Sequence, residues 1–376
     1  MKTRLERLGD FVRIQTGKLD ANASDPHGMY PFFTCAVEPL RISHYSYDCE
    51  CVLVAGNGDL NVKYYFGKFD AYQRTYIIQS LDRDHLDVRY LYYFMRSYVG
   101  RLRELSIGGV IKYIKLGYLT EAKIPIPSIS EQRRITAILD KGEDLIANRA
   151  ASLALLSQVE KLTFLDLFGD PQVNPMGWPL LPMRKLFSEA PVFGTMTPAT
   201  EELKGWLCLR VANIQNWRLD LADRKYVELE GGALARHTLR DGDIVMARAI
   251  ATEEQLGKCV TVYPNGEQWA FDSHLVRLRF DRSIVDPEYV RQLLATPGGR
   301  SRFLGVSRRS AVQFNVNTKE ISRLEIPVPP LALQSRFLQA LNNLKRVRSV
   351  QESSKSQLDT LLACLQSRAF AGDLQP

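Results

Sequence analysis

Residues 122–139 read AKIPIPSISEQRRITAIL, and residues 323–341 read RLEIPVPPLALQSRFLQAL. The second stretch repeats the first: the Ile-Pro-Ile-Pro run that starts at Ile124 matches the Ile-Pro-Val-Pro run that starts 202 positions later, at Ile326. Two polar positions then follow at the same spacing in both stretches. Such a match over a long period indicates an internal repeat rather than a shared turn.

The match continues on both sides of these stretches. Upstream, DVRYLYYFM at 87–95 pairs with DPEYVRQLL at 286–294, 199 positions later. Downstream, LFGDPQ at 167–172 pairs with FAGDLQ at 370–375, 203 positions later. Because the spacing stays nearly constant across blocks of different composition, the sequence predicts a tandem duplication.

Each copy begins with a part of mixed composition. Short apolar runs such as CVLVA at 51–55 and DIVMA at 243–247 are separated by Gly, Asn and Asp, which is typical of β-strands and turns. Residues 90–105, YLYYFMRSYVGRLREL, have the apolar spacing of a helix. We therefore expect a mixed α/β domain in each copy, which ends at the Ile-Pro run because proline continues neither a ladder nor a helix interior.

A long amphipathic helix is predicted after each Ile-Pro run. In the first copy Ser130 is the expected N-cap, Glu131 supplies negative charge to the first turn, and apolar residues recur at helical spacing as far as Phe168. At about 1.5 Å per residue this helix would be about 57 Å long. A narrow apolar stripe on so long a helix needs a partner, so we expect the two helices to pair antiparallel, as in a coiled coil.

Composition limits the functions that remain open. The 376-residue chain is 45% hydrophobic and 24% charged, as in ordinary globular proteins, and its net charge of +7 permits a local surface for nucleic acid or an acidic partner. No window approaches about 18 uninterrupted apolar residues, the length of a membrane span. The start, MKTRLERLGD, lacks the apolar segment of a signal peptide. We expect no membrane segment, no Sec secretion and a cytoplasmic location.

Motifs for catalysis and for metal binding are absent from the sequence. The six cysteines are scattered, with one close pair at Cys49 and Cys51, and zinc-site spacing is lacking, so we expect reduced thiols and no metal. AGNGDLN at 55–61 is interpreted as a β-turn rather than a nucleotide-binding loop. The chain has no phosphate-binding loop and no amino-methyltransferase loop. We predict no catalytic residue and no cofactor in this chain.

Signals for binding are stronger than signals for catalysis. Both copies carry Lys, Arg, Asn or Gln on predicted loops, several beside aromatic residues, and these side chains donate hydrogen bonds to phosphates and base edges. The alternative for any one of them is a solvated surface. The candidates for DNA binding are Lys18, Lys63, Gln73, Arg74, Lys112 and Lys115 in the first copy, and Arg248, Lys258, Arg308, Arg309, Gln313 and Asn315 in the second.

Several motifs together resemble one protein family. They are LGDFVRIQTGK at 8–18, GDIVMARAIATEEQLGK at 242–258 and the two Ile-Pro blocks, and the most diagnostic is the P-x-x-x-E-Q-x-x-I pattern of Pro127, Glu131, Gln132 and Ile135. With these motifs and the tandem arrangement, the chain resembles the specificity (S) subunit of a type I DNA restriction–modification enzyme over essentially its whole length. The second block departs from the pattern, because PPLALQ lacks a counterpart of Glu131.

The resemblance implies an architecture and a set of partners. Two mixed α/β target-recognition domains in tandem repeat would each read one half of a bipartite site in double-stranded DNA. Two long antiparallel helices would form a coiled-coil spacer that sets the distance between half-sites and docks two methyltransferase subunits, with restriction/translocase subunits joining them. S-adenosylmethionine would belong to the methyltransferase partner, so no cofactor is expected in this chain.

The same resemblance assigns limits and docking residues. The expected segments are a first target-recognition domain at 1–129, a central helix at 130–170, a second target-recognition domain at 171–331 and a C-terminal helix at 332–376. The candidates for partner docking are Glu131, Gln132, Ile135, Gln334 and Arg336. Two alternatives stay open: a coiled-coil adaptor that binds proteins and not DNA, and an S-like subunit of a related defence system. Steeply salt-dependent DNA affinity would separate the first alternative from the main hypothesis.

Overall fold

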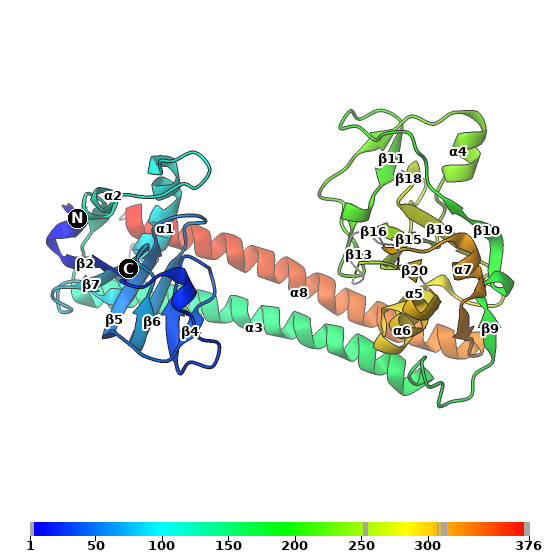
Figure 1. Ribbon diagram of the computed structural model, residues 1–376, viewed down its shortest axis with the longest axis horizontal. Helices are drawn as coiled ribbons and strands as arrows, with labels where there is room; N and C mark the ends of the chain where they lie inside the picture. Colours follow the sequence, from blue (N-terminus) through cyan, green and yellow to red (C-terminus); the bar gives the residue numbers. More distant parts are fainter. Residues whose placement is uncertain (1–3, 251–254, 307, 310–313, 372–376) are drawn as a thin grey trace. The chain divides into compact units, whose positions relative to one another are not determined.

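The computed structural model describes residues 4–250, 255–306, 308–309 and 314–371. The chain forms two compact units (Figure 1). The first unit combines Met1–Ser152 with Gln351–Pro376, and the second unit is Leu153–Val350. The four segments expected from the sequence follow a different division of the chain, and their limits stay a prediction.

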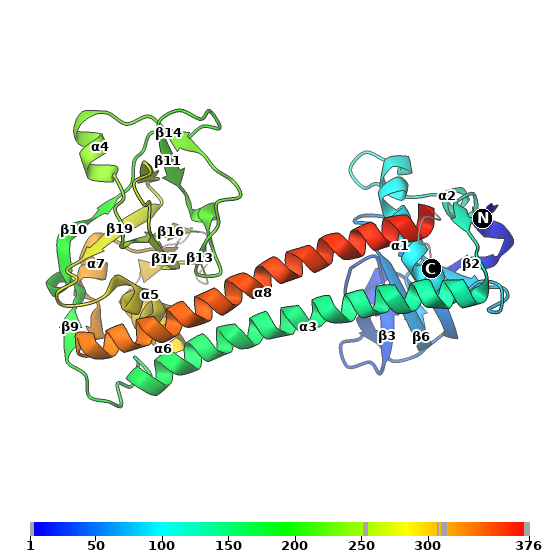
Figure 2. The ribbon, with the colours of Figure 1, turned by 180° about the vertical axis from the view of Figure 1, so that it is seen from behind.

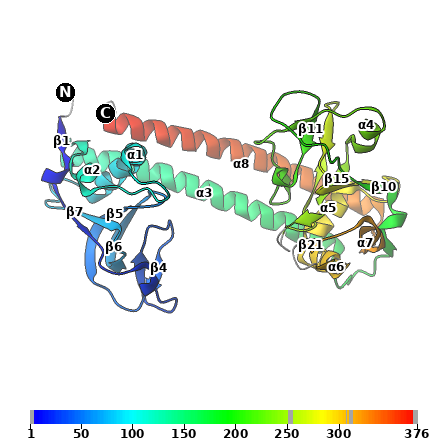
Figure 3. The same cartoon turned by 45° about the horizontal axis from the view of Figure 1, so that its top comes forward.

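The first unit is built on a six-stranded sheet with strand order β2-β7-β5-β6-β3-β4, in which β7, β5 and β6 lie side by side (Figure 3). Strand β3 runs parallel to β6, and the other neighbours are antiparallel. Its strands are β1 (Leu5–Arg7), β2 (Val12–Thr16), β3 (Tyr30–Phe33), β4 (Leu40–Ile42), β5 (Tyr47–Ala55), β6 (Val62–Ala71), β7 (Thr75–Ser80) and β8 (Lys123–Pro125), and its shorter helices are η1 (Leu8–Asp10), η2 (Ala21–Ala23), α1 (Val88–Leu105) and α2 (Leu116–Thr120).

The predicted strand CVLVA lies in β5 and is buried on both faces of this sheet. Val52 and Val54 join a core beneath helix α1, whereas Leu53 faces a second cluster with Phe33 and Phe69. Because side chains alternate between the two faces of a strand, a strand covered on both faces is apolar throughout, as this run is.

The second unit repeats this frame with additions. Its four-stranded sheet has the order β10-β19-β15-β17, and a further sheet has the order β14-β11-β18. Its strands are β9 (Leu180–Pro182), β10 (Phe187–Phe193), β11 (Trp206–Leu209), β12 (Ile214–Gln215), β13 (Arg218–Leu219), β14 (Tyr226–Val227), β15 (Asp243–Ala247), β16 (Ala249–Ile250), β17 (Cys259–Val262), β18 (Trp269–Phe271), β19 (Leu275–Phe280), β20 (Arg308–Arg309), β21 (Phe314–Asn315) and β22 (Glu325–Pro327). Its shorter helices are η3 (Met183–Lys185), η4 (Val211–Asn213), α4 (Gly231–His237), α5 (Pro287–Ala295), α6 (Pro297–Val306) and α7 (Thr318–Arg323).

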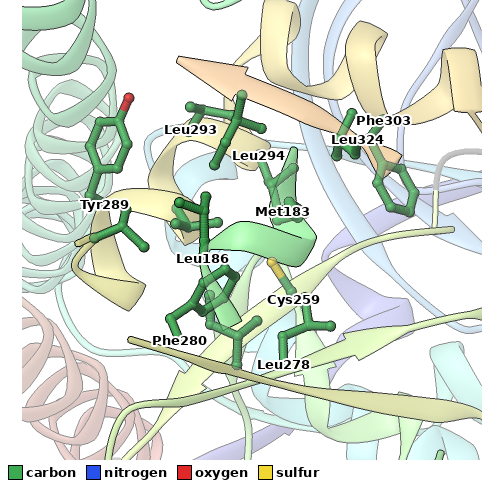
Figure 4. Packing of buried hydrophobic residues seen from close by; sticks show 14 of the residues in the cluster. Met183, Leu186, Cys259, Leu278, Phe280, Tyr289, Leu293, Leu294, Phe303 and Leu324 are labelled. Atoms are coloured by element: carbon green, nitrogen blue, oxygen red, sulfur yellow. The ribbon is translucent and has the colours of Figure 1, made fainter. Parts of the chain in front are cut away.

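Equivalent strands confirm the duplication. The order β10-β19-β15-β17 matches β2-β7-β5-β6, and β11 runs parallel to β18 as β3 does to β6. The predicted strand DIVMA is β15, which is buried on both faces like β5. On one face Leu278 and Phe280 pack with Tyr289 and Leu293 of helix α5 (Figure 4).

The Ile-Pro runs are short strands that close each unit. Strand β8 pairs with β1, and β22 pairs with β9 in the same antiparallel manner. A buried tyrosine hydroxyl then donates to the carbonyl of the last residue of each strand: Tyr90 to Pro125 at 2.9 Å, and Tyr289 to Pro327 at 2.8 Å. These tyrosines are 199 positions apart, as the sequence repeat requires.

Two long helices follow the Ile-Pro runs, as predicted: α3 (Ile129–Phe168) and α8 (Leu331–Ala371) (Figure 2). They pair antiparallel within each unit. In the first unit Gly142 lies against Leu362, and Arg149 bonds Gln351. In the second unit the Phe164 ring meets the Phe337 ring edge-on, with centroids 5.5 Å apart. The mixed α/β fold with two long antiparallel helices is therefore confirmed.

The cap of the first long helix differs from the prediction. Helix α3 begins at Ile129, so Ser130 already lies inside it and the predicted N-cap is wrong. Ser128 takes that role, because its hydroxyl accepts from the Glu131 N–H at 3.4 Å. Ser128 and Ser130 both precede the same apolar stripe, and the stripe alone does not determine which of them is the N-cap.

Candidate nucleic-acid interface

Four loops of the first unit meet through backbone hydrogen bonds. The turn between β6 and β7 is bonded to the residue after β2. The turn between β5 and β6 is bonded both to the β6–β7 turn and to the loop before α2. All of these hydrogen bonds have ordinary lengths. These bonds are Gly17 N–H to Thr75 O at 3.1 Å, Gly56 N–H to Arg74 O at 2.8 Å, Gly58 N–H to Lys112 O at 3.0 Å and Ile114 N–H to Gly56 O at 2.9 Å.

This loop cluster brings together candidates that are far apart in sequence. Lys18, Gln73, Arg74, Lys112 and Lys115 all have exposed side chains on its loops. The Gln73 amide donates to the Asp20 carboxylate at 2.7 Å, which holds it beside Lys18. The first unit therefore gathers exposed cations and an amide donor on connected loops, a composition suited to phosphate and base contacts.

Lys63 differs from the other candidates. Its side chain is half-buried, and its ammonium group donates to the Asn61 side chain. Burial lowers the pKa of Lys63, because a desolvated ammonium ion is less stable than one in water. Asn61 in turn donates to the Cys35 carbonyl at 2.8 Å. Lys63 thus stiffens the loop cluster more than it presents charge to a ligand.

The second unit builds the same cluster from equivalent backbone bonds. Three bonds of the first unit have a counterpart between matching strands and turns, although the side chains differ. The counterparts are Gly194 N–H to Leu275 O at 3.2 Å, Arg248 N–H to His274 O at 3.0 Å and Val316 N–H to Arg248 O at 3.0 Å.

Arg248 lies at the centre of the second cluster, where the first unit has Gly56. Its guanidinium carbon lies 3.9 Å from the centroid of the Phe193 ring, and its Nε donates to the Ser273 carbonyl at 2.8 Å. Burial lowers its pKa. Half-buried Lys258 is next to it, since the Lys258 carbonyl accepts from the Ala247 N–H at 2.9 Å. Both cations are thus held on a defined backbone.

Three of the remaining candidates of the second copy, Arg308, Arg309 and Asn315, lie on two short paired strands. The backbone of Arg308 and Arg309 forms β20, which pairs with Asn315 of β21, and β21 also pairs with β16 beside Arg248. Gln313 lies outside the described residues. Strand pairing through β21 therefore connects these strands to the second loop cluster.

The docking candidates fall into two groups. Gln132, Ile135 and Gln334 are buried inside their own units, so their side chains hold the fold and present no surface to a partner. Arg336 is exposed, and Glu131 is half-exposed and bonded to Arg134 at 2.7 Å. That pairing lowers the pKa of Glu131, because the bond to Arg134 stabilises the carboxylate.

Several residues of the loop clusters were not predicted from the sequence. Arg103 of α1 reaches the Asp59 carboxylate at 3.0 Å and the Leu60 carbonyl at 3.1 Å, which ties α1 to the turn after β5. Gly17 and Gly194 are also part of the clusters, because a Cβ on either would overlap a carbonyl oxygen of the neighbouring turn. A glycine directly after a strand in both copies was the signal that could have revealed them.

Within the described residues there is neither a candidate metal cluster nor a candidate membrane-spanning helix. In the part of the chain that the structure describes, no cluster of three His, Cys, Asp or Glu side chains could hold a metal ion. Among the residues 4–250, 255–306, 308–309 and 314–371, no helix is both long and apolar enough to cross a membrane.

The known proteins that this chain matches are type I restriction specificity proteins. The model of the type I restriction modification DNA specificity domain matches residues 4–158. The chain is 26% identical to the type I restriction enzyme EcoDI specificity subunit of Escherichia coli, over 98% of this chain and 87% of that protein. Over nearly its whole length the chain is therefore similar to type I restriction specificity subunits. A second specificity subunit, StySPI of Salmonella potsdam, is 23% identical over 76% of this chain and 65% of its own length.

Two solved structures have the same fold as this chain. The S subunit of a type I restriction-modification system from M. genitalium has a TM-score of 0.58 at 17% identity, covering 97% of this chain and 95% of that one. A chain from a study of complex assembly and conformational transition of the type I R-M system has a TM-score of 0.60 at 16% identity, covering 99% and 98%. At these identities the match establishes the architecture alone.

Proposed function

We propose that this chain is the DNA-recognition subunit of a type I restriction–modification complex. Its first and second units would each read one half of a bipartite site in double-stranded DNA. One observation carries the proposal: the two units build the same loop cluster from equivalent backbone bonds, yet place different side chains on it. A shared frame with different side chains is what two readers of two different half-sites require.

The side chains of the first loop cluster favour DNA over a purely protein partner. Exposed lysines and Arg74 supply charge for phosphates, and Gln73 is an amide of the type that reads adenine in the major groove. A coiled-coil adaptor would need only the helices, and would leave these connected loops without a purpose. The adaptor alternative is therefore not favoured.

We propose that chemistry on the DNA belongs to partner subunits. Two methyltransferase subunits, with S-adenosylmethionine, would dock against α3 and α8 near Glu131 and Arg336, and restriction/translocase subunits would join them in the cytoplasm. The helices would set the number of base pairs between half-sites. The sequence supports this division of labour, because it carries no methyltransferase loop and no nucleotide-binding loop.

A methylation map tests the function. The chain is expressed with the methyltransferase encoded beside it in a host that lacks adenine methylation, and modified adenines are mapped by long-read sequencing. We expect a split motif with a fixed spacer that disappears when this chain is omitted. Exchange of residues 4–128 for those of another specificity subunit should change one half of the motif only. A continuous motif, or one that persists without this chain, would contradict the proposal.

A further inference from the structure

One loop of the first cluster presents apolar side chains to water. Residues 107–113, IGGVIKY, form a tight hairpin whose ends exchange two hydrogen bonds, Ile107 N–H to Tyr113 O at 3.0 Å and Tyr113 N–H to Ile107 O at 2.9 Å. At its tip Val110 is fully exposed, and Ile111 is 62% exposed. Ile114, directly after the hairpin, is buried in the core of the unit.

The backbone of this hairpin is held in place. The turn after β5 holds it through two backbone hydrogen bonds, from the Gly58 N–H to the Lys112 carbonyl and from the Ile114 N–H to the Gly56 carbonyl. Tyr113 also forms a β-bridge with Asn57 of that turn. Gly108 has a φ of 118°, which favours glycine, and a Cβ there would overlap the carbonyl oxygen of Ile111. The hairpin is therefore constrained at its base and along one side, and its two apolar side chains stay outside the core.

Charge around the tip indicates what covers it. Lys112 directly follows the apolar pair and Lys115 lies three residues further on; both are exposed, and Arg74 lies on the next turn of the same cluster. Exposed valine and isoleucine with cations beside them match a surface that offers phosphates at its edge and stacked apolar rings within. Double-stranded DNA is such a surface.

We propose that Val110 and Ile111 form an apolar wedge that enters a groove of the half-site read by the first unit and partly unstacks one base step. Lys112 and Lys115 would hold neighbouring phosphates. This inference rests on the proposed DNA-reading function and adds to it a specific contact with the DNA. It concerns the first unit only, because residues 310–313, at the matching positions of the second copy, lie outside the described residues.

Unstacking has a direct optical readout. The full chain is purified with its methyltransferase subunits and bound to duplexes that carry the motif found by methylation mapping. A 2-aminopurine replaces one base at a time in the first half-site, and the methylated adenine is left unlabelled. We expect fluorescence to rise several-fold at one step and to stay near that of free duplex at the others, because 2-aminopurine brightens when it leaves the stack.

Matched variants assign the signal to the wedge. Val110→Ser with Ile111→Ser should abolish the rise and weaken specific binding about tenfold, within the range that such insertions involve. Val110→Ile should keep the rise, and Leu81→Ser, which alters an apolar side chain of similar exposure (63%), should change neither signal nor affinity. Unchanged thermal transitions show that each variant is folded.

Three results would overturn the wedge. The serine pair could bind as wild type, the rise could persist in that variant, or no labelled step could brighten although wild type binds its motif. The third result would leave recognition intact and remove only the wedge. Absence of motif-specific binding by wild type would instead contradict the proposed function itself, so the two failures are distinct.

Discussion

Gln132 and Gln334 share two equivalent hydrogen bonds in the two units. The side-chain oxygen of each accepts from the N–H of an aspartate before a helix, Asp87 at 2.9 Å and Asp286 at 2.8 Å. The side-chain nitrogen of each donates to the carbonyl five residues earlier, at 2.9 Å for Gln132 and 2.7 Å for Gln334. Both side chains are fully buried. Each glutamine thus joins the start of a long helix to the start of a domain helix.

Loss of one such glutamine should destabilise its unit. Gln334→Ala leaves the Asp286 N–H and the Pro329 carbonyl without their partner, which we expect to cost about 2–3 kcal/mol in the free energy of unfolding. Urea denaturation measures the change. Gln339→Ala, at an exposed site on the same helix, should stay within about 0.5 kcal/mol of wild type. Equal effects of the two variants would contradict the assigned role.

Glycine at the end of β2 should be required by the fold. A Cβ on Gly17 would overlap the carbonyl oxygens of Ala71 and Tyr72, so Gly17→Ala must move the turn after β6, and we expect a loss above about 2 kcal/mol. Gly100 of α1 has open space around it, and Gly100→Ala should instead stabilise by about 0.5–1 kcal/mol. Thermal unfolding of both variants checks the sign of each change.

Lys112 and Lys115 should contribute charge to DNA binding rather than preference for a DNA sequence. Replacement of Lys112 and Lys115 by Ala should weaken binding to all duplexes by a similar factor. It should also reduce the slope of log affinity against log salt by about one for each phosphate that is no longer neutralised. A salt series with specific and non-specific duplexes measures both effects. The control is Lys123→Ala, an exposed lysine on β8. An unchanged slope in the double variant would remove these lysines from the interface.

Acid should weaken the second unit through Glu288. Burial pushes the pKa of this carboxyl up, but the charges of Arg291 and Lys345 outweigh burial and hold the pKa below its ordinary value. A carboxyl group whose pKa is lowered in the folded state stabilises the fold when the pH is above the ordinary pKa of that group. This contribution is lost as the pH falls through the folded-state pKa. The wild-type unfolding temperature should therefore drop more steeply below about pH 4.5 than that of Glu288→Gln. Parallel curves would contradict this account.

Helix length should set the spacer of the DNA motif. Deletion of residues 146–152 together with 350–356 removes about two turns from each helix, or about 10 Å, and keeps the pairing of their remaining faces. At about 3.4 Å per base pair, the spacer should shorten by about three base pairs. Methylation mapping of the deleted chain gives the result. A methylated motif with the original spacer would exclude the helices as its determinant.

The sequence repeat predicted the parts of the fold that depend on side chains. Gln132 and Gln334 occupy equivalent sites, and so do Tyr90 and Tyr289. Their hydrogen bonds need a particular side chain, so the same residue type recurs at the repeat spacing and can be recognised in the sequence. The loop clusters were harder to align. Gly56 and Arg248 are equivalent only through their backbone N–H and carbonyl groups, which any residue other than proline supplies. Lys63 is predicted to be a contact residue because it is a cation directly before two tyrosines, and its half-burial could not be inferred from that pattern.

The first unit is discontinuous in the chain, whereas the second is a single stretch. A ribosome makes the chain from the N-terminus, so every residue of the second unit exists before the last turns of α8 are synthesised. Those last turns complete the first unit: Ala369 is buried in its core, and the Phe370 ring lies 5.3 Å from that of Tyr90. The unit that is begun first during translation is therefore finished last, and until then Tyr90 and Phe94 of α1 lack their contact with the Phe370 ring.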